Sequence, residues 1–264
     1  MKKNHPFHLV SKSPWPILSS MNIFTNIFTT MLGITMWMYK KNIMFMITGT
    51  LLTSVCAILW WRDITRESTF QGNHTMKVMK GLKMGMILFI MSEMMFFFSF
   101  FWSFFHSSLS PSIEIGMNWP PKSIKSFNPL EVPLLNTIIL LSSGATVTWM
   151  HNSTLNNKMN QSMKSMAMTI TLGIYFTILQ KWEYSQSEFA ISDSIYGSTF
   201  FVSTGFHGMH VMIGTLFLMV MLLRMKKLHF SQNHHMGLEA AIWYWHFVDI
   251  VWLFLYISIY WWGK

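Results

Sequence analysis

The chain of 264 residues is 52% hydrophobic and only 11% charged, and it is rich in Met (26), Phe (23) and Trp (13). Because soluble domains contain about 25% charged residues, this composition argues against a soluble globular protein and favours an integral membrane protein. A formal net charge of +9 could suggest nucleic acid as a partner. The basic residues lie in the short gaps between apolar segments, however, and such placement is typical of membrane orientation, so no nucleic acid is expected.

Seven segments of the chain are long and apolar enough to cross a bilayer as helices, which takes about 20 residues. They lie at 16–38, 43–61, 81–105, 132–150, 165–182, 198–223 and 240–262. The first two are separated by the sequence YKKN, which predicts a tight helical hairpin. The predicted fold class is an all-α integral membrane protein with seven transmembrane helices.

The clearest internal boundary is the polar stretch RDITRESTFQGNHTMKVMK, which contains Gly72 and no apolar run. It lies between the second and third predicted helices. We therefore predict three parts. They are an N-terminal segment with a two-helix hairpin (1–62), a polar linker (63–80) and a five-helix bundle (81–264).

The distribution of basic residues predicts the orientation of the helices. Thirteen of the 19 Lys and Arg residues lie in the N-terminal segment and the even-numbered loops, which share one side of the membrane. By the positive-inside bias this side, with the N-terminus, faces the compartment from which the chain inserts. On the opposite side Glu183, Glu188 and Asp193 predict an acidic outer face that could attract a cationic partner.

Glu93 is the one acid in the third apolar segment, within the sequence MSEMMFFFSFFWSFFH. An ionisable side chain in the middle of a membrane helix costs about 3 kcal/mol or more, so it must be paired, hydrated or protonated. One interpretation is a proton-linked carboxyl, since burial disfavours the ionised form. The other is a structural carboxyl whose hydrogen bond fastens two helices.

Two pairs of polar side chains lie in the last two segments. His207 and His210 are three residues apart in STGFHGMHVMIG and share one helical face. They could present two imidazoles to a metal, but without a nearby Cys or carboxylate a hydrogen bond to Glu93 is the favoured interpretation. His246 and Asp249, also three apart, predict a buried pair in which acid and imidazole neutralise each other.

Basic and aromatic residues mark the membrane edge at two places, after the second and after the sixth segment. Arginines beside tryptophans suit lipid phosphates, and an ordinary basic flank is the alternative. The predicted phospholipid-binding residues are Trp61, Arg62, Arg66, Glu67, His74, Arg224, Lys227 and His229.

Several kinds of active site are missing from the sequence, which has no phosphate-binding glycine loop, Cys-rich metal site or nucleophile elbow. We therefore expect no catalytic residue and no metal site in this chain. Two other functions stay open as alternatives. One is an independent transporter coupled through Glu93, although the repeats and interrupted helices typical of transporters are not seen. The other is a redox centre held by His207 and His210.

Five long stretches are specific enough to compare with known families. They are WWRDITRESTFQGNHT, GMILFIMSEMMFFFSFFWSFFHSSLSP, NPLEVPLLNT, EYSQSEFAISDSIYGSTFFVSTGFHGMHV and NHHMGLEAAIWYWHFVDIVWLFLYISIYWWG. In these stretches the chain resembles mitochondrially encoded cytochrome c oxidase subunit III. The similarity runs from residues 13–16 to the C-terminus. It is poorest in 151–168 and in parts of the first two predicted helices, and nothing functional is carried over to these parts.

The resemblance implies seven transmembrane helices, with the first two splayed from the other five around a lipid-filled cleft. It also implies a non-catalytic core subunit of cytochrome c oxidase, respiratory complex IV, which stabilises subunit I. Oxygen reduction by cytochrome c, coupled to proton pumping, belongs to the complex. In this family the haem and copper centres lie in subunits I and II, so this chain is expected to hold bound phospholipids and no cofactor of its own.

The implied partners are subunits I and II, accessory subunits and phospholipid, with cytochrome c only an indirect partner. The implied location is the mitochondrial inner membrane, with the N-terminus toward the matrix. Glu93 corresponds to the family's membrane-embedded carboxyl, and Lys83 stands where a basic residue enters the third helix. The positions that correspond to the surroundings of the family's bound phospholipids are Arg62, Arg66, Glu67, His74 and Arg224.

Overall fold

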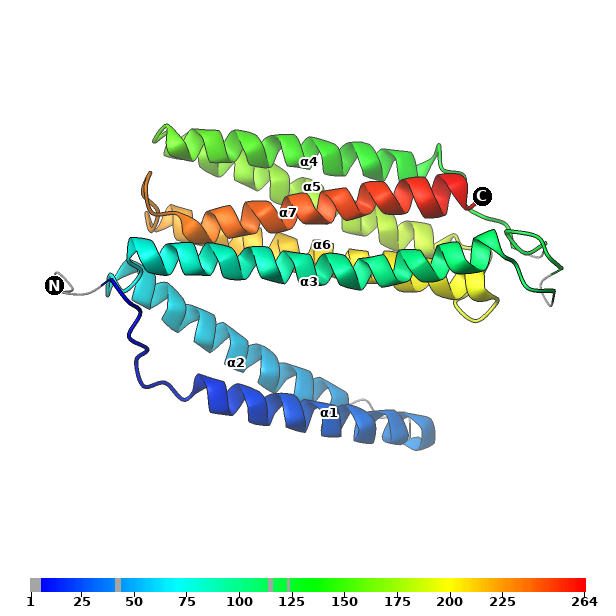
Figure 1. Cartoon of the computed structure of the whole chain (residues 1–264), viewed down its shortest axis with the longest axis horizontal. Helices are drawn as coiled ribbons and strands as arrows, with labels where there is room; N and C mark the ends of the chain where they lie inside the picture. The colour runs from blue at the N-terminus through cyan, green and yellow to red at the C-terminus, as the bar shows by residue number, and fades with distance from the viewer. Residues whose placement is uncertain (1–5, 41–43, 114–115, 123) are drawn as a thin grey trace. The chain divides into compact units, whose positions relative to one another are not determined.

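The structure, a computed structural model, describes residues 6–40, 44–113, 116–122 and 124–264. Its helices are α1 (Trp15–Lys40), α2 (Met44–Thr69), α3 (Met76–Leu109), α4 (Val132–Leu155), α5 (Met159–Ser185), α6 (Ile195–Lys226) and α7 (Met236–Leu255), which continues as the π-helical segment η2 (Tyr256–Trp262). Among the described residues, seven helices are long and apolar enough to span a membrane (Figure 1). The prediction of an all-α membrane protein with seven helices is thus confirmed.

The helices continue beyond the apolar segments that predicted them. Because α2 runs to Thr69 and α3 starts at Met76, the stretch 63–80 is largely helical and only residues 70–75 connect the two helices. A helix satisfies its own backbone hydrogen bonds, so its polar ends can extend into the lipid headgroup layer. Gly72, in the connection, has a φ of 63°, a left-handed conformation that glycine adopts without steric penalty.

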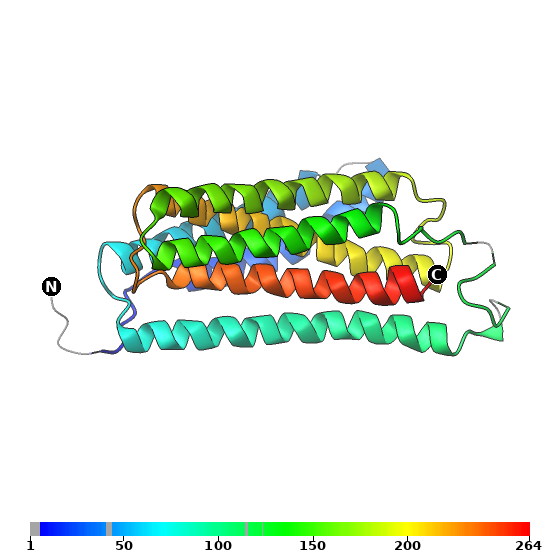
Figure 2. The same ribbon diagram turned by 90° about the horizontal axis from the view of Figure 1, so that it is seen from above.

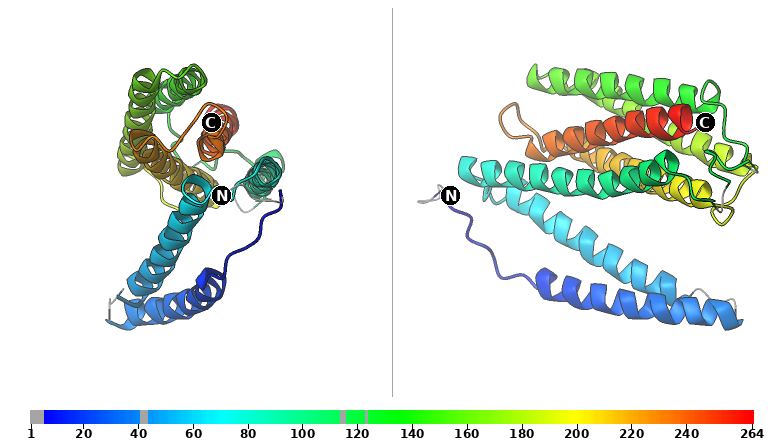
Figure 3. Two further views of the ribbon diagram at one scale, coloured as in Figure 1. Left: turned by 90° about the vertical axis from the view of Figure 1, so that its left-hand side faces the viewer. Right: turned by 45° about the vertical axis from the view of Figure 1, so that its right-hand side comes forward.

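The chain divides into two compact units, Met1–Leu82 and Lys83–Lys264. In the first unit α1 and α2 form a helical hairpin (Figure 3). Its helices pack closely at two glycines. A Cβ added to Gly33 or Gly49 would lie only 2.3 Å or 2.1 Å, respectively, from a side-chain atom of the other helix. Small residues of this kind let membrane helices approach each other closely.

In the second unit α4, α5, α6 and α7 lie side by side (Figure 2) and pack around a common core. The helix α3 adds two buried phenylalanines to this core. Trp245 and Trp252 of α7 are the largest fully buried side chains. Their indole N–H groups donate to the hydroxyls of Ser143 (2.9 Å) and Thr137 (3.0 Å) on α4. A buried indole needs such a partner, so these two bonds fix α7 against α4.

The Phe-rich part of α3 has two faces. Phe97 and Phe104 are buried in the core, whereas Phe98 and Trp102 are 63% and 65% exposed. In a bilayer, exposed aromatic side chains on a spanning helix contact lipid or another chain without a hydrophobic penalty. One helix therefore both closes the core and presents an apolar outer surface.

Candidate functional site

Glu93 of α3 meets His210 of α6 inside the second unit. The carboxylate oxygen Oε2 of Glu93 lies 3.0 Å from Nε2 of His210. The other ring nitrogen, Nδ1, lies 2.7 Å from the carbonyl oxygen of Phe206, one turn earlier on α6. The side chains of Glu93 and His210 are only 24% and 11% exposed. The structure thus brings Glu93 to one of its two expected histidine partners.

This geometry places one proton between Glu93 and His210. A carbonyl oxygen can only accept, so the Nδ1–H of His210 donates to Phe206, and Nε2 of the neutral ring is then an acceptor. A hydrogen bond to Glu93 therefore forms when the carboxyl is protonated, or when the ring carries a second proton and faces a carboxylate. In both cases the pair holds one ionisable proton within a helix interface.

A shallow hollow on the surface of the second unit leads to this pair. Its lining residues are Ser92, Glu93, Phe96, Phe206, Met209, His210 and Ile213. The ring of Phe97 packs edge-on against the His210 ring, with 5.0 Å between centroids. The walls are mainly apolar, so the carboxyl faces an environment suited to lipid or to an apolar neighbour.

His207, the other expected partner, does not contact Glu93. It is fully buried, and its Nε2 lies 3.3 Å from the carbonyl oxygen of Val248 on α7. Its ring packs against Phe176 and Trp252, at centroid distances of 5.6 Å and 5.2 Å. Of the two alternative partners, the structure therefore has His210 beside the acid, because packing turns the ring of His207 toward α7.

His246 and Asp249 are close but not hydrogen-bonded. Nδ1 of His246 lies 3.8 Å from Oδ2 of Asp249, and the histidine side chain is 36% exposed while the carboxyl is buried. That separation exceeds hydrogen-bond length. A Cβ added to Gly144 of α4 would lie 2.8 Å from the same carboxylate oxygen. The expected buried pair is thus a buried acid enclosed by α4, with a half-exposed histidine beside it.

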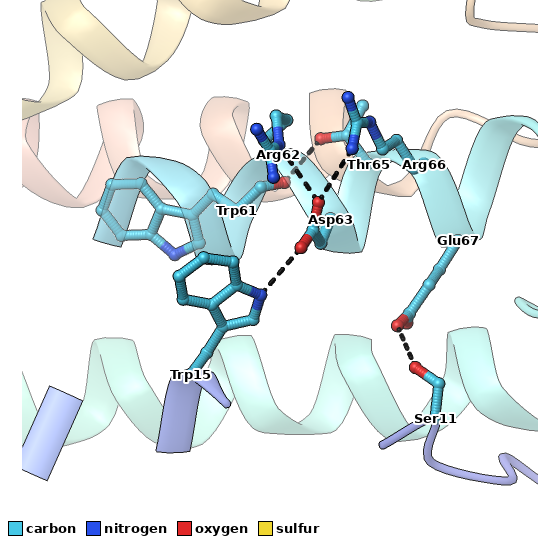
Figure 4. A network of polar contacts seen from close by, with 8 residues as sticks. All are labelled: Ser11, Trp15, Trp61, Arg62, Asp63, Thr65, Arg66 and Glu67. Atoms are coloured by element: carbon cyan, nitrogen blue, oxygen red, sulfur yellow. Dashed lines mark hydrogen bonds and ion pairs between the residues drawn. The ribbon is translucent and has the colours of Figure 1, made fainter. Parts of the chain in front are cut away.

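Asp63 is the centre of a polar network at the end of α2 (Figure 4). Its Oδ1 lies 3.1 Å from Nε of Arg62 and 3.3 Å from Nη1 of Arg66, and its Oδ2 accepts the indole N–H of Trp15 at 2.7 Å. Two guanidinium groups on one carboxylate leave one net positive charge. Sequence reasoning missed Asp63, because its partner Trp15 is 48 residues away.

The segment before α1 lies against the same end of α2 in the first unit. Glu67 accepts a hydrogen bond from the hydroxyl of Ser11 at 3.2 Å and lies 3.6 Å from Nε2 of His8. The His8 ring packs edge-on against His74, at 6.4 Å between centroids. Trp61, by contrast, is 67% exposed. Of the expected lipid-binding residues here, Glu67 and His74 therefore hold the N-terminal segment, and Trp61 faces outward.

The second expected lipid edge follows α6. The guanidinium of Arg224 lies over the ring of Phe230, 4.6 Å from its centroid. Partial burial and the positive charges of Arg224 and Lys227 lower the pKa of His229 below its usual range. Because His229 is then uncharged at neutral pH, the positive charge of this predicted lipid edge is carried by Arg224 and Lys227.

The acidic outer face is smaller in the structure than expected. Glu183 is 2% exposed, because α5 continues to Ser185 and carries this residue into the core. Glu188 is exposed and lies 2.7 Å from the ammonium group of Lys125. Their hydrogen bond and opposite charges raise the pKa of Lys125. The third acid, Asp193, accepts a hydrogen bond from the backbone N–H of Ala190 at 2.7 Å. The three carboxylates therefore do not form a free acidic cluster.

Comparison with known proteins gives a consistent match along the chain. A family described as cytochrome c oxidase subunit III matches residues 5–264. Cytochrome c oxidase subunit 3 of Drosophila melanogaster is 58% identical over 260 residues, which cover 98% of each chain. The proteins of the same name from Paracentrotus lividus and Pisaster ochraceus are 56% and 57% identical, and in each case the match covers 100% of both chains.

Proposed function

Because the chain belongs to the cytochrome c oxidase subunit III family, we propose that it is a core subunit that stabilises subunit I of the oxidase and carries no redox centre itself. The single observation behind this proposal is the family match along nearly the whole chain. The two histidines considered for a redox centre contact Glu93 and a backbone carbonyl, which suits a structural or proton-linked role better than metal ligation.

Glu93 and His210 support a proton-linked role within this subunit. A carboxyl at a helix interface that shares one proton with an imidazole can accept or release that proton without losing its position. The apolar hollow beside it is suited to lipid or to the surface of subunit I. We propose that the pair adjusts proton access to subunit I, where oxygen is reduced and protons are pumped.

Phospholipid binding is supported by the basic end of α2 and by the basic edge after α6. Arg62 and Arg66 share Asp63 and keep one net positive charge beside the exposed Trp61. A guanidinium that is only partly satisfied can still donate to a phosphate oxygen. The proposed location is the mitochondrial inner membrane with the N-terminus toward the matrix, which agrees with the distribution of basic residues.

Removing this chain from the purified oxidase tests the proposal. The depleted complex is expected to keep its haem absorbance, because the redox centres lie in other subunits, and to lose activity progressively during turnover. Reconstitution with the purified chain should restore sustained turnover. Loss of haem absorbance on removal of this chain alone would refute the absence of a redox centre, and unchanged, stable turnover would refute the supporting role.

A further inference from the structure

Three side chains with metal-ligating atoms converge where α4 ends and α7 begins. They are His151 on the last turns of α4, His235 at the N-terminal boundary of α7, and Glu239 in the first turn of α7. One ligand atom from each lies within 4.8 Å of the others. Both helix ends belong to the second unit and meet at the same end of its bundle (Figure 1).

His235 is held in the orientation that a metal ligand needs. Its Nδ1 lies 3.0 Å from the carbonyl oxygen of Ser231, which can only accept, so the proton is on Nδ1 and the lone pair is on Nε2. This arrangement, in which the second ring nitrogen donates to a carbonyl, is the usual support of a metal-bound histidine. His235 is only 6% exposed, and its Nε2 has no hydrogen-bond partner among the described residues.

The atoms that face this Nε2 are acceptors as well. Glu239 Oε1 lies 3.3 Å away, and Nε2 of His151 is also buried without a hydrogen-bond partner among the described residues. A lone pair that faces a carboxylate and another imidazole is unfavourable unless a cation or a proton lies between them. Two imidazole nitrogens and one carboxylate oxygen, with a fourth position left for water, form a known ligand set for zinc.

Lys83 occupies the other side of the same carboxylate. Its ammonium group forms an ion pair with Oε2 of Glu239 and leaves Oε1 toward the two histidines. This contact orients the carboxylate, but its positive charge also opposes a metal ion a few ångströms away. Lys83 should therefore weaken metal binding without preventing it, which gives a reversible site rather than a permanently occupied one.

We propose that His151, His235 and Glu239 form a reversible binding site for a divalent transition metal, with zinc the best-suited ion. Sequence reasoning missed it, although the spacing of His235 and Glu239 places them one helical turn apart. His151 lies 84 positions before His235, in the stretch where the resemblance is poorest.

Zinc binding to the purified, intact oxidase tests this site. After treatment with a mild chelator, equilibrium dialysis against zinc at pH 7.5 should show one exchangeable zinc that is absent, or bound at least tenfold more weakly, in His151→Gln. This variant leaves the Lys83–Glu239 ion pair in place. The matched control is His234→Gln, which removes the neighbouring histidine outside the cluster and should bind zinc as the unmodified oxidase does.

A second variant separates metal binding from a shared proton. Lys83→Met removes the competing charge and should tighten zinc binding by roughly tenfold. Zinc-edge X-ray absorption of the unmodified complex should show two imidazole nitrogens in this site. Equal zinc binding by the unmodified complex, His151→Gln and Lys83→Met would overturn the proposal and would mean that a proton, rather than a metal, lies between these side chains.

Discussion

Substitutions at Glu93 and His210 separate hydrogen bonding from proton binding. The amide of Glu93→Gln can still donate to Nε2 of His210, so this variant should assemble with nearly unchanged stability while it loses the ionisable proton. His210→Ala leaves the carboxyl without its partner, and the free energy of unfolding should fall by about 1–3 kcal/mol.

The measurements for this pair are thermal dissociation of the chain from the purified oxidase and reaction with an apolar carbodiimide. The carboxyl transfers its proton to a carbodiimide nitrogen, and the carboxylate oxygen then attacks the central carbon, so a protonated carboxyl is needed. We expect labelling of Glu93 in the unmodified complex at neutral pH and none in Glu93→Gln. Labelling confined to other carboxyls of the unmodified chain would show that Glu93 is ionised or inaccessible, and would contradict the protonated form of the pair.

At the scale of single residues, the sequence limits the expected partners of Glu93 to two histidines but does not decide between them. The spacing of His207 and His210 places both on one side of α6, so each could reach an acid on a neighbouring helix. Which one does depends on the rotation of α6, and this is set by the packing of His207 against Trp252. Sequence reasoning does not find the partner of Asp63, because Trp15 at the start of α1 reaches it only when α1 packs against α2 in the hairpin.

Single glycines decide how closely the helices of the first unit pack. Gly49→Ala would place a Cβ 2.1 Å from Oγ1 of Thr29 and 3.2 Å from the backbone of Asn26, so the Thr29 side chain must turn away and the backbone of α1 must shift slightly. Such overpacking typically costs about 1–3 kcal/mol. We expect a lower temperature for dissociation of the chain from the oxidase, measured by native gels after graded heating.

Gly81→Ala is the control for this experiment, because a Cβ at that position of α3 meets nothing within 4 Å. Alanine is also the better helix former, so this variant should be as stable as the unmodified chain or slightly more stable. An equal loss of stability in both variants would mean that the close approach of α1 and α2 contributes nothing.

Helices are the elements that sequence predicts best here, because the length of an apolar segment is itself the physical requirement for crossing a bilayer. Their ends are predicted less well. Residues such as Arg66 and Glu183 are polar, yet they extend α2 and α5 beyond the apolar segments. Glu183 is buried because α5 extends past it to Ser185. The sequence around Glu183 contains no local pattern that indicates this burial.

At the scale of the whole molecule, the basic edges at the ends of α2 and α6 are expected to bind anionic phospholipid in the complex. Arg62→Gln combined with Arg66→Gln removes both guanidinium groups around Asp63, and we expect the loss of at least one tightly bound anionic phospholipid per complex. Mass spectrometry of lipids extracted from the purified oxidase measures this. Lys158→Gln, which removes an exposed charge between α4 and α5, should keep the full lipid content.

The length of α3 determines how the membrane potential acts on Glu93. With 34 residues α3 is about 51 Å long, against a hydrocarbon core of about 30 Å. Glu93 lies 17 residues after Met76, about 26 Å along the helix and so at its middle, which is the bilayer midplane when the bilayer is centred on α3. A proton that reaches it from either face crosses about half of the membrane potential, which is worth about 1 kcal/mol per 100 mV. Proton transfer to this carboxyl is therefore expected to depend on the membrane potential.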